Sequence, residues 1–181
     1  MIQLVEYDEQ AEGLISDVAW ASVLVKERKG PAARIKKRYS YLSAKEFARR
    51  WIAALYCVTK YLSVKMDWTL TPDANFEAPH FFLEGISCKV RMPTYLDPMM
   101  KFDRLDLIRV KLVFLCTEPG ERKVAIHGCV SYQRFEKESQ LTTLPGQKDP
   151  CLIMKASQMT PVDSWRKEAS WKPDGQMGLP L

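Results

Sequence analysis

The chain has 181 residues, 46% of them hydrophobic, which is enough for one domain with a substantial core and too few for several domains. Its formal net charge of +5 favours an anionic partner. The longest apolar runs are too short to span a bilayer, so we expect a cytoplasmic protein with no membrane partner.

The cysteines support the same expectation. They are odd in number and form no Cys-x-x-Cys pair, and three of them lie within apolar, strand-like runs. This pattern predicts buried free thiols in a reducing compartment. The acidic N-terminal residues, with no basic segment ahead of an apolar run, give no indication of a signal peptide.

Two helices are predicted in the first third of the chain. Residues 8–25 carry apolar side chains on one helical face. Ser43 and Glu46 have the spacing of a capping box, which predicts a helix from there to about Leu62. Arg49 and Arg50 should lie on the exposed side of this second helix.

A basic run lies between the two helices, with Gly30-Pro31 breaking any helix inside it. Such a run is most often a solvated loop. It also fits an arm that contacts the backbone of a nucleic acid, because clustered cations release counterions from a polyanion. The cations of this predicted arm are Lys26, Arg28, Lys29, Arg34, Lys36, Lys37 and Arg38.

A β-hairpin is predicted next, with a turn at Glu84-Gly85 and its second strand over residues 86–91. In that strand Ile86, Cys88 and Val90 alternate with polar residues and should point into a core. Ser87, Lys89 and Arg91 should then share an open face, within reach of a common phosphate.

The second half of the chain predicts further strands over 105–116 and 123–130, separated by a turn at 118–121. The chain beyond residue 130 is expected to be rich in loops, with a short helix starting near Thr160-Pro161. The prediction is therefore an α+β fold, with one domain over 1–155 and a C-terminal helix and irregular tail over 156–181.

This order of helices, hairpin and central strands resembles the PD-(D/E)XK, or restriction-endonuclease-like, nuclease superfamily over roughly residues 43–135. The resemblance implies an α/β sandwich, in which a central mixed sheet of about four to five strands is flanked by helices. It also implies nucleic acid as the partner, DNA ahead of RNA, and a site in which two acids and a lysine hold Mg²⁺ and orient water.

The family motif fits the chain in two ways. In the first, its Pro-Asp falls on Pro79-His80 and its acid-x-Lys falls on Lys89-Val90-Arg91. His80 and Lys89 then replace the two acids, and Arg91 replaces the lysine. Two fixed cations without a carboxylate suit a phosphate and not Mg²⁺. This alignment implies a degenerate nuclease that binds nucleic acid without cutting it, as a binding or assembly subunit.

In the second alignment, the motif falls on Pro72-Asp73 and on Ser87-Cys88-Lys89. Some members of the superfamily have Ser or Thr at the second acid and take the missing carboxylate from further along the chain. Asp103, fourteen residues after Lys89, lies near that spacing. The resemblance then implies a Mg²⁺-dependent endonuclease with Asp73, Ser87, Lys89 and Asp103 as its catalytic residues and the two aspartates as metal ligands.

Simpler interpretations remain beside these. Lys89 and Arg91 are also what the solvated face of an ordinary edge strand carries. A protein-interaction module, in which the basic run meets an acidic protein surface, is a third hypothesis for the function. A homodimer or a complex with another protein is the other association that we consider.

Overall fold

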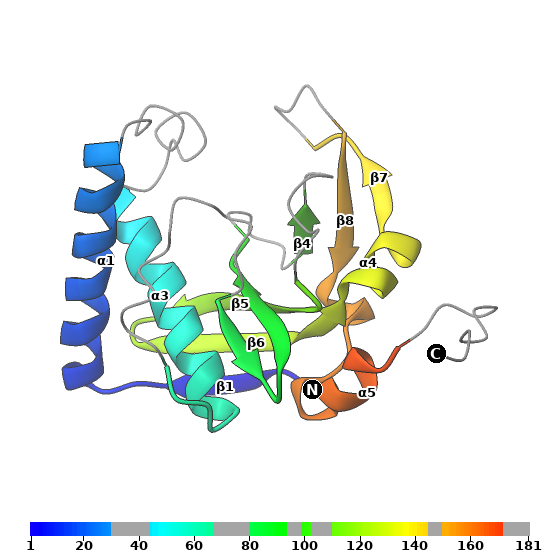
Figure 1. The fold of residues 1–181 in the computed structure, drawn as a ribbon, viewed down its shortest axis with the longest axis horizontal. Coiled ribbons are helices and arrows are strands. Elements are labelled where there is room, and N and C mark those ends of the chain that lie inside the picture. The colour runs from blue at the N-terminus through cyan, green and yellow to red at the C-terminus, as the bar shows by residue number, and fades with distance from the viewer. Residues whose placement is uncertain (30–43, 67–79, 94–98, 103–109, 145–149, 172–181) are drawn as a thin grey trace.

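The computed structural model describes residues 1–29, 44–66, 80–93, 99–102, 110–144 and 150–171. It confirms the α+β prediction (Figure 1). In chain order the elements are β1 (Gln3–Glu6), α1 (Glu9–Lys29), α3 (Ala44–Tyr61), β2 (Phe81–Leu83), β3 (Ile86–Arg91), β4 (Met99–Phe102), β5 (Leu112–Gly120), β6 (Lys123–Ser131), α4 (Tyr132–Glu138), β7 (Gln140–Thr142), β8 (Cys151–Lys155), two 3-10 turns, η1 (Ala156–Gln158) and η2 (Val162–Ser164), and α5 (Trp165–Ala169).

The central sheet has five strands in the order β1-β6-β5-β3-β2, which confirms the expected strand number. It is mixed, because β3 and β5 are parallel while the other neighbouring pairs are antiparallel. The predicted hairpin is present as β2 and β3. Its two turn residues have positive φ, 50° at Glu84 and 80° at Gly85, as a two-residue hairpin turn requires.

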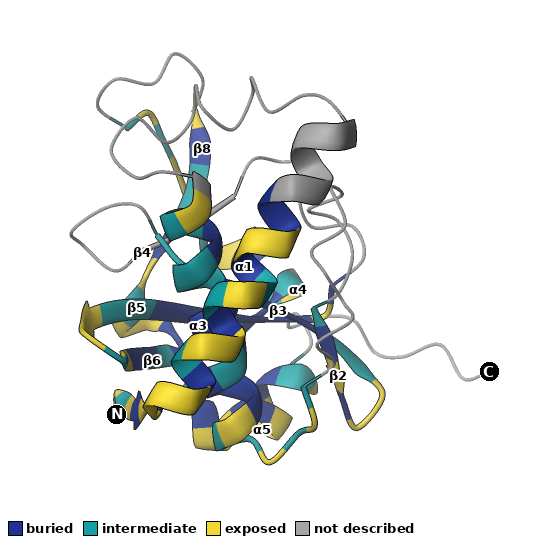
Figure 2. Ribbon diagram, turned by 90° about the vertical axis from the view of Figure 1, so that its left-hand side faces the viewer, coloured by how far each residue is buried: buried dark blue, intermediate teal, exposed yellow. Residues whose placement is uncertain are grey.

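Two layers cover the faces of this sheet. Helices α1 and α3 pack on one face, where α3 contributes a continuous apolar stripe that includes Ile52, Leu55 and Val58. On the other face, Phe135 of α4 and Met154 of β8 pack against residues of β5 and β6. Figure 2 shows the buried residues along β5 and the alternating buried and exposed stripes of α1.

A second sheet of three antiparallel strands, in the order β4-β8-β7, lies on the side of the molecule away from α1. The prediction that the chain beyond residue 130 is mostly loop is therefore wrong. Helix α4 starts there because the Ser131 hydroxyl accepts a hydrogen bond from the Arg134 backbone N–H at 3.3 Å, which caps its first turn.

Several predicted boundaries need correction. Helix α1 continues to Lys29, so the first cations of the basic run belong to a helix. The predicted strand 105–116 is instead β5, which begins at Leu112. The turn expected at 118–121 falls at Glu121 and Arg122, where φ of Arg122 is 54°. A sequence window cannot set such limits, because the pairing of β5 with β6 sets them.

The predicted C-terminal helix is present as η2 followed by α5, and it is part of the main core. Val162 and Trp165 are buried together with residues of α1, α3 and the central sheet. Residues 156–171 thus pack on the domain that we expected to end at 155. In the part of the chain that the structure describes, no helix is long and apolar enough to cross a membrane.

Candidate functional site

The polar face of β3 is the part of the predicted site that the structure describes. Cys88 and Val90 are buried in the core shared with α3, so strand alternation directs Ser87, Lys89 and Arg91 to the opposite side of the sheet. The three side chains share one side of a single strand, as both alignments of the nuclease motif require.

The prediction that Lys89 lies on an open face is wrong, because only 1% of this residue is exposed. Its neighbour on β5 is Val113, which is buried in the cluster that includes Phe135 and Met154. A second layer of α4 and β8 therefore covers this part of the sheet. Arg91, two residues further along and paired with Leu115, is partly exposed.

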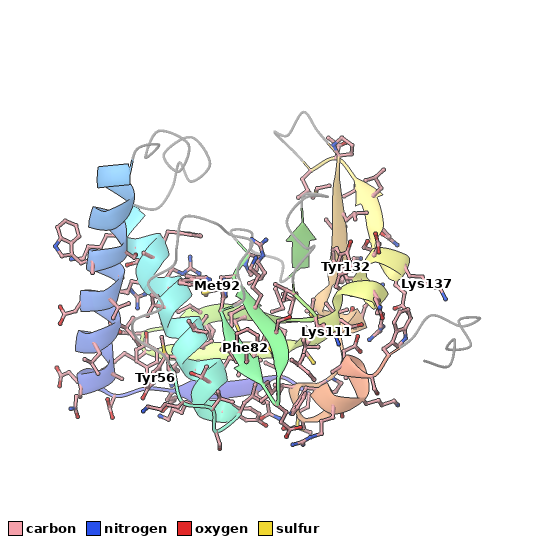
Figure 3. All side chains as sticks on the ribbon, in the orientation of Figure 1. Tyr56, Phe82, Met92, Lys111, Tyr132 and Lys137 are labelled. Carbon is pink, nitrogen blue, oxygen red and sulfur yellow. The ribbon has the colours of Figure 1, made fainter. Side chains whose placement is uncertain are left out.

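Ser87 joins β3 to the residue that precedes β5. The Lys111 backbone N–H donates to the Ser87 hydroxyl oxygen at 3.0 Å and to the Ser87 carbonyl oxygen at 3.1 Å. The Lys111 carbonyl in turn accepts from the backbone N–H of Tyr132, the first residue of α4, at 3.1 Å. Figure 3 labels the side chains of Lys111 and Tyr132. These bonds fix the side chain of Ser87 and leave the exposed side chain of Lys111 at the edge of the polar face.

His80 closes the open end of the hairpin. Its backbone N–H donates to the Cys88 carbonyl at 2.8 Å, and its Nδ1 accepts from the Val90 backbone N–H at 3.1 Å. The ring meets Trp51 of α3 edge to face, with centroids 4.6 Å apart. Nδ1 is therefore occupied as an acceptor, so the proton of the neutral imidazole is on Nε2.

Burial holds the pKa of His80 well below its usual value, and the positive charges of Lys89 and Arg91 lower it further. The three groups are thus close enough to interact electrostatically. Among the described residues, His80 at neutral pH is therefore an uncharged imidazole with two cationic side chains near it.

The other predicted site residues lie outside the described part of the chain. These are both candidate metal ligands, Asp73 and Asp103, and the arm residues Arg34, Lys36, Lys37 and Arg38. The backbones of Lys26, Arg28 and Lys29 form the last turns of α1, but their side chains are not described. Among the described residues, no group of three His, Cys, Asp or Glu could hold a metal ion.

Arg49 and Arg50 are ion-paired and only partly exposed, whereas helical spacing predicted them on the exposed side of the helix. Both donate to Glu118 of β5, Arg49 through Nη2 at 2.8 and 2.9 Å and Arg50 through Nε at 3.0 Å. Arg49 also donates two hydrogen bonds of 3.0 Å to Glu46, and the hydrogen bonds that it donates to the Glu46 and Glu118 carboxylates raise its pKa despite its burial. These arginines therefore join α3 to the sheet.

Glu168 is a buried carboxylate that sequence analysis did not identify. It accepts from the Ser131 backbone N–H and from Arg134 Nη1, each at 2.8 Å, and from the Thr160 hydroxyl. Burial alone would raise its pKa, but these hydrogen bonds outweigh burial and hold the pKa below the usual value. This cluster fixes α5 against β6 and α4. The acid-x-Lys pattern used in the sequence analysis could not identify Glu168, because its partners lie far from it in the sequence.

Comparison with protein-family models, with curated proteins and with solved structures found no match to the chain.

Proposed function

We propose that this chain is a nucleic-acid-binding protein with a nuclease-like fold, which binds the phosphate backbone at the polar face of β3 and does not cut it. The single observation that carries the proposal is the position of two accessible cations: Arg91 is partly exposed on the polar face of β3, and Lys111 is exposed at the edge of that face. In this proposal the chain acts as a binding or assembly subunit.

The side chains at the motif positions support phosphate binding over metal binding. His80, in the place of the first acid, already accepts a hydrogen bond on Nδ1 and packs against Trp51. Ser87 already accepts a backbone hydrogen bond from Lys111. Hard oxygen ligands for Mg²⁺ would have to come from other segments. Arg91, which is partly exposed, and Lys111, which is exposed at the edge of the polar face, by contrast carry the donors that a phosphate oxygen needs.

The basic run supplies the second half of the proposed interface. Its first cations continue α1 to Lys29, and the remainder follow in the sequence up to Arg38. Each cation that neutralises a phosphate releases a counterion, so affinity should fall steeply with salt and depend little on base sequence. DNA is the first substrate to test, with RNA as the alternative.

A second candidate function, a Mg²⁺-dependent endonuclease, is favoured by the position of Ser87 and Lys89 on one face of β3, as the second alignment of the motif requires. Asp73 and Asp103 would bind the metal, Lys89 would lie beside the attacking water, and Ser87 would stand where the family's second acid does.

The test measures binding of a fluorescent DNA duplex by anisotropy at several salt concentrations, with wild type beside Arg91→Ala and Lys111→Ala. Each substitution should weaken binding about tenfold and reduce the salt slope by about one, because one phosphate contact is lost. Lys167→Ala is the matched control, since this exposed lysine lies on α5 and not on the polar face of β3, and it should leave both quantities unchanged.

Cleavage separates the two functions. Under the proposal, a supercoiled plasmid stays intact with Mg²⁺ or Mn²⁺. Calorimetry with either metal then gives the same result for wild type and for Asp73→Ala. Nicking that Asp73→Ala abolishes would replace the proposal with the endonuclease. Equal loss of duplex affinity in Lys167→Ala, Arg91→Ala and Lys111→Ala would locate binding elsewhere and contradict the proposal.

A further inference from the structure

A row of four residues crosses the central sheet at the end of β3 that is nearest the hairpin turn. Phe82 of β2 pairs with Ser87 of β3. The Lys111 backbone N–H donates to the Ser87 hydroxyl, and the Lys111 carbonyl accepts from the Tyr132 backbone N–H. The row therefore consists of Phe82, Ser87, Lys111 and Tyr132. Figure 3 labels Phe82, Lys111 and Tyr132 on these neighbouring elements.

The side chain of Phe82 lies on the same face of the sheet as that of Ser87. Phe81 and Leu83, its neighbours in β2, are buried in the core shared with α3, so strand alternation directs Phe82 to the opposite face. Phe82 is 59% exposed. An aromatic ring in water beside polar residues is a surface on which a flat partner, such as another ring or a nucleic-acid base, can stack.

The cation in this row indicates which flat partner fits. Lys111 is exposed, and two strand spacings, or about 10 Å, separate its backbone from that of Phe82. One nucleotide can cover that distance between its base and an adjoining phosphate. Tyr132 adds a second, partly exposed ring on the other side of Lys111. Aromatic rings interleaved with cations are typical of surfaces that bind single-stranded nucleic acid.

The described carboxylates beside the row do not reverse its charge. Glu84, in the hairpin turn, forms an ion pair with Arg166. Glu136 accepts a hydrogen bond from the Tyr132 hydroxyl at 3.2 Å. Glu136 is thus one acid against Lys111 and Arg91, so the charge of these groups together is positive and complementary to a phosphate backbone.

We propose that the nucleic acid bound at the polar face of β3 is single-stranded, with an unpaired base stacked on Phe82 and the adjoining phosphate bound by Lys111. This inference rests on the proposed function and adds the class of its ligand. In a duplex each base is stacked between its neighbours, so its faces are covered and only the phosphates reach the protein. A single strand offers both contacts, and it should therefore bind more tightly than a duplex of the same length.

Fluorescence anisotropy with a labelled oligothymidylate and with a duplex of the same length tests the stacking contact. Phe82→Leu keeps an apolar side chain and removes the ring, so it should weaken single-strand binding about tenfold and leave duplex binding unchanged. Phe82→Trp, which keeps a ring, should bind the single strand as wild type does. Leu141→Ala is the control, since Leu141 is 54% exposed but lies on β7, outside the row, and should leave both affinities unchanged.

A strand with abasic sites separates stacking from phosphate binding, because it keeps the phosphates and lacks the bases. Wild type should bind it about tenfold more weakly than the intact strand, and Phe82→Leu should weaken it no further. Lys111→Ala should weaken binding of the intact strand, the abasic strand and the duplex alike. If Phe82→Leu binds the intact strand as wild type does while Lys111→Ala binds it weakly, the stacking inference is overturned and the proposed function stands. A wild-type chain that binds neither strand nor duplex would overturn both.

Discussion

Lys89 is a cationic residue of β3 that lies beneath the second layer, and only 1% of it is exposed. Arg91 adds a second cation on the same strand face. His80, at the end of the same hairpin, must stay neutral beside them, because its Nδ1 accepts the Val90 N–H and burial disfavours the imidazolium. The neutral state of His80 is thus set by single contacts and by burial.

The first prediction concerns pH. The pKa of His80 is lower in the folded protein than the ordinary value of 6.5, so the unfolded chain takes up a proton first as pH falls. The contribution of neutral His80 to the free energy of unfolding is therefore complete above pH 6.5. It is lost below that pH, by up to about 1.4 kcal/mol for each pH unit. His127, whose pKa burial also lowers, adds to this loss. Urea unfolding between pH 7.5 and 5.5 measures it.

His80→Asn is the informative variant for this prediction, because an amide oxygen can replace Nδ1 as acceptor but does not titrate. Its free energy of unfolding should fall less than that of wild type over the same pH range. Glu168 does not interfere, since its pKa lies below the usual value for a carboxyl group and it stays ionised there. An identical pH dependence in wild type and variant would show that His80 is not held neutral.

At the scale of the elements, the packing of β6 against the loop after η1 depends on one glycine. Gly128 has φ of 151°, and a Cβ added there would lie 2.5 Å from the Thr160 carbonyl oxygen. The neighbouring Cys129 exchanges two backbone hydrogen bonds with Thr160, of 2.8 and 3.0 Å, so this carbonyl cannot easily move. The close approach of two backbone segments explains why this position in a central strand is glycine.

Gly128→Ala should therefore lower the free energy of unfolding by at least about 2 kcal/mol. Gly120→Ala is the matched control, because a Cβ at Gly120 meets nothing within 4 Å. It should change stability by less than about 1 kcal/mol. Chemical denaturation of both variants measures the difference. Equal losses would mean that Thr160 moves away or that the loss reflects only the removal of glycine from a strand.

The local elements of the fold could be predicted from the sequence. Which elements cover each face of the sheet could not. The hairpin turn at Gly85 and the helix ending near Leu62 follow from turn chemistry and from apolar spacing, and both are present. Alternation correctly assigned Lys89 to the face opposite Val90. It could not show that α4 and β8 cover that face, because that depends on contacts with residues more than forty positions away.

The candidate site was predictable to a smaller extent. The order of residues along β3 is enough to bring Ser87, Lys89 and Arg91 to one side of the strand. Spacing alone gave Arg49 as an exposed cation, but its position is determined by Glu118, 69 residues later in the chain. Asp73 and Asp103 remain predictions, because they fall outside the described residues.

At the scale of the whole molecule, one core connects the two ends of the chain. Trp165 of α5 is 5% exposed and packs in the cluster that also contains Ala11 and Ile15 of α1. The buried bonds of Glu168 to Ser131 and Arg134 attach the same helix to the opposite layer. The C-terminal helix is thus a structural part of the domain, and the protein should unfold as one unit.

Trp165→Ala should lower the free energy of unfolding by about 3–5 kcal/mol and leave a single transition. Trp171→Ala provides the comparison, since Trp171 is only partly buried and lies beneath Lys137, with the ammonium 5.7 Å from its ring centroid. That change should cost about 1 kcal/mol or less. Circular dichroism and tryptophan fluorescence, followed together in urea, would contradict the prediction if they showed two separate transitions.

The position of β1 also affects how the protein forms during synthesis. Gln3 pairs with Ile126, which is 123 positions later, so β1 has no partner strand until β6 has left the ribosome. At a translation rate of about 5–20 residues per second, that delay is about 6–25 s. Throughout this interval Leu4 and Val5 of β1 have no β6 to pair with. Chaperone binding to this segment would keep it from pairing with other nascent chains before β6 arrives.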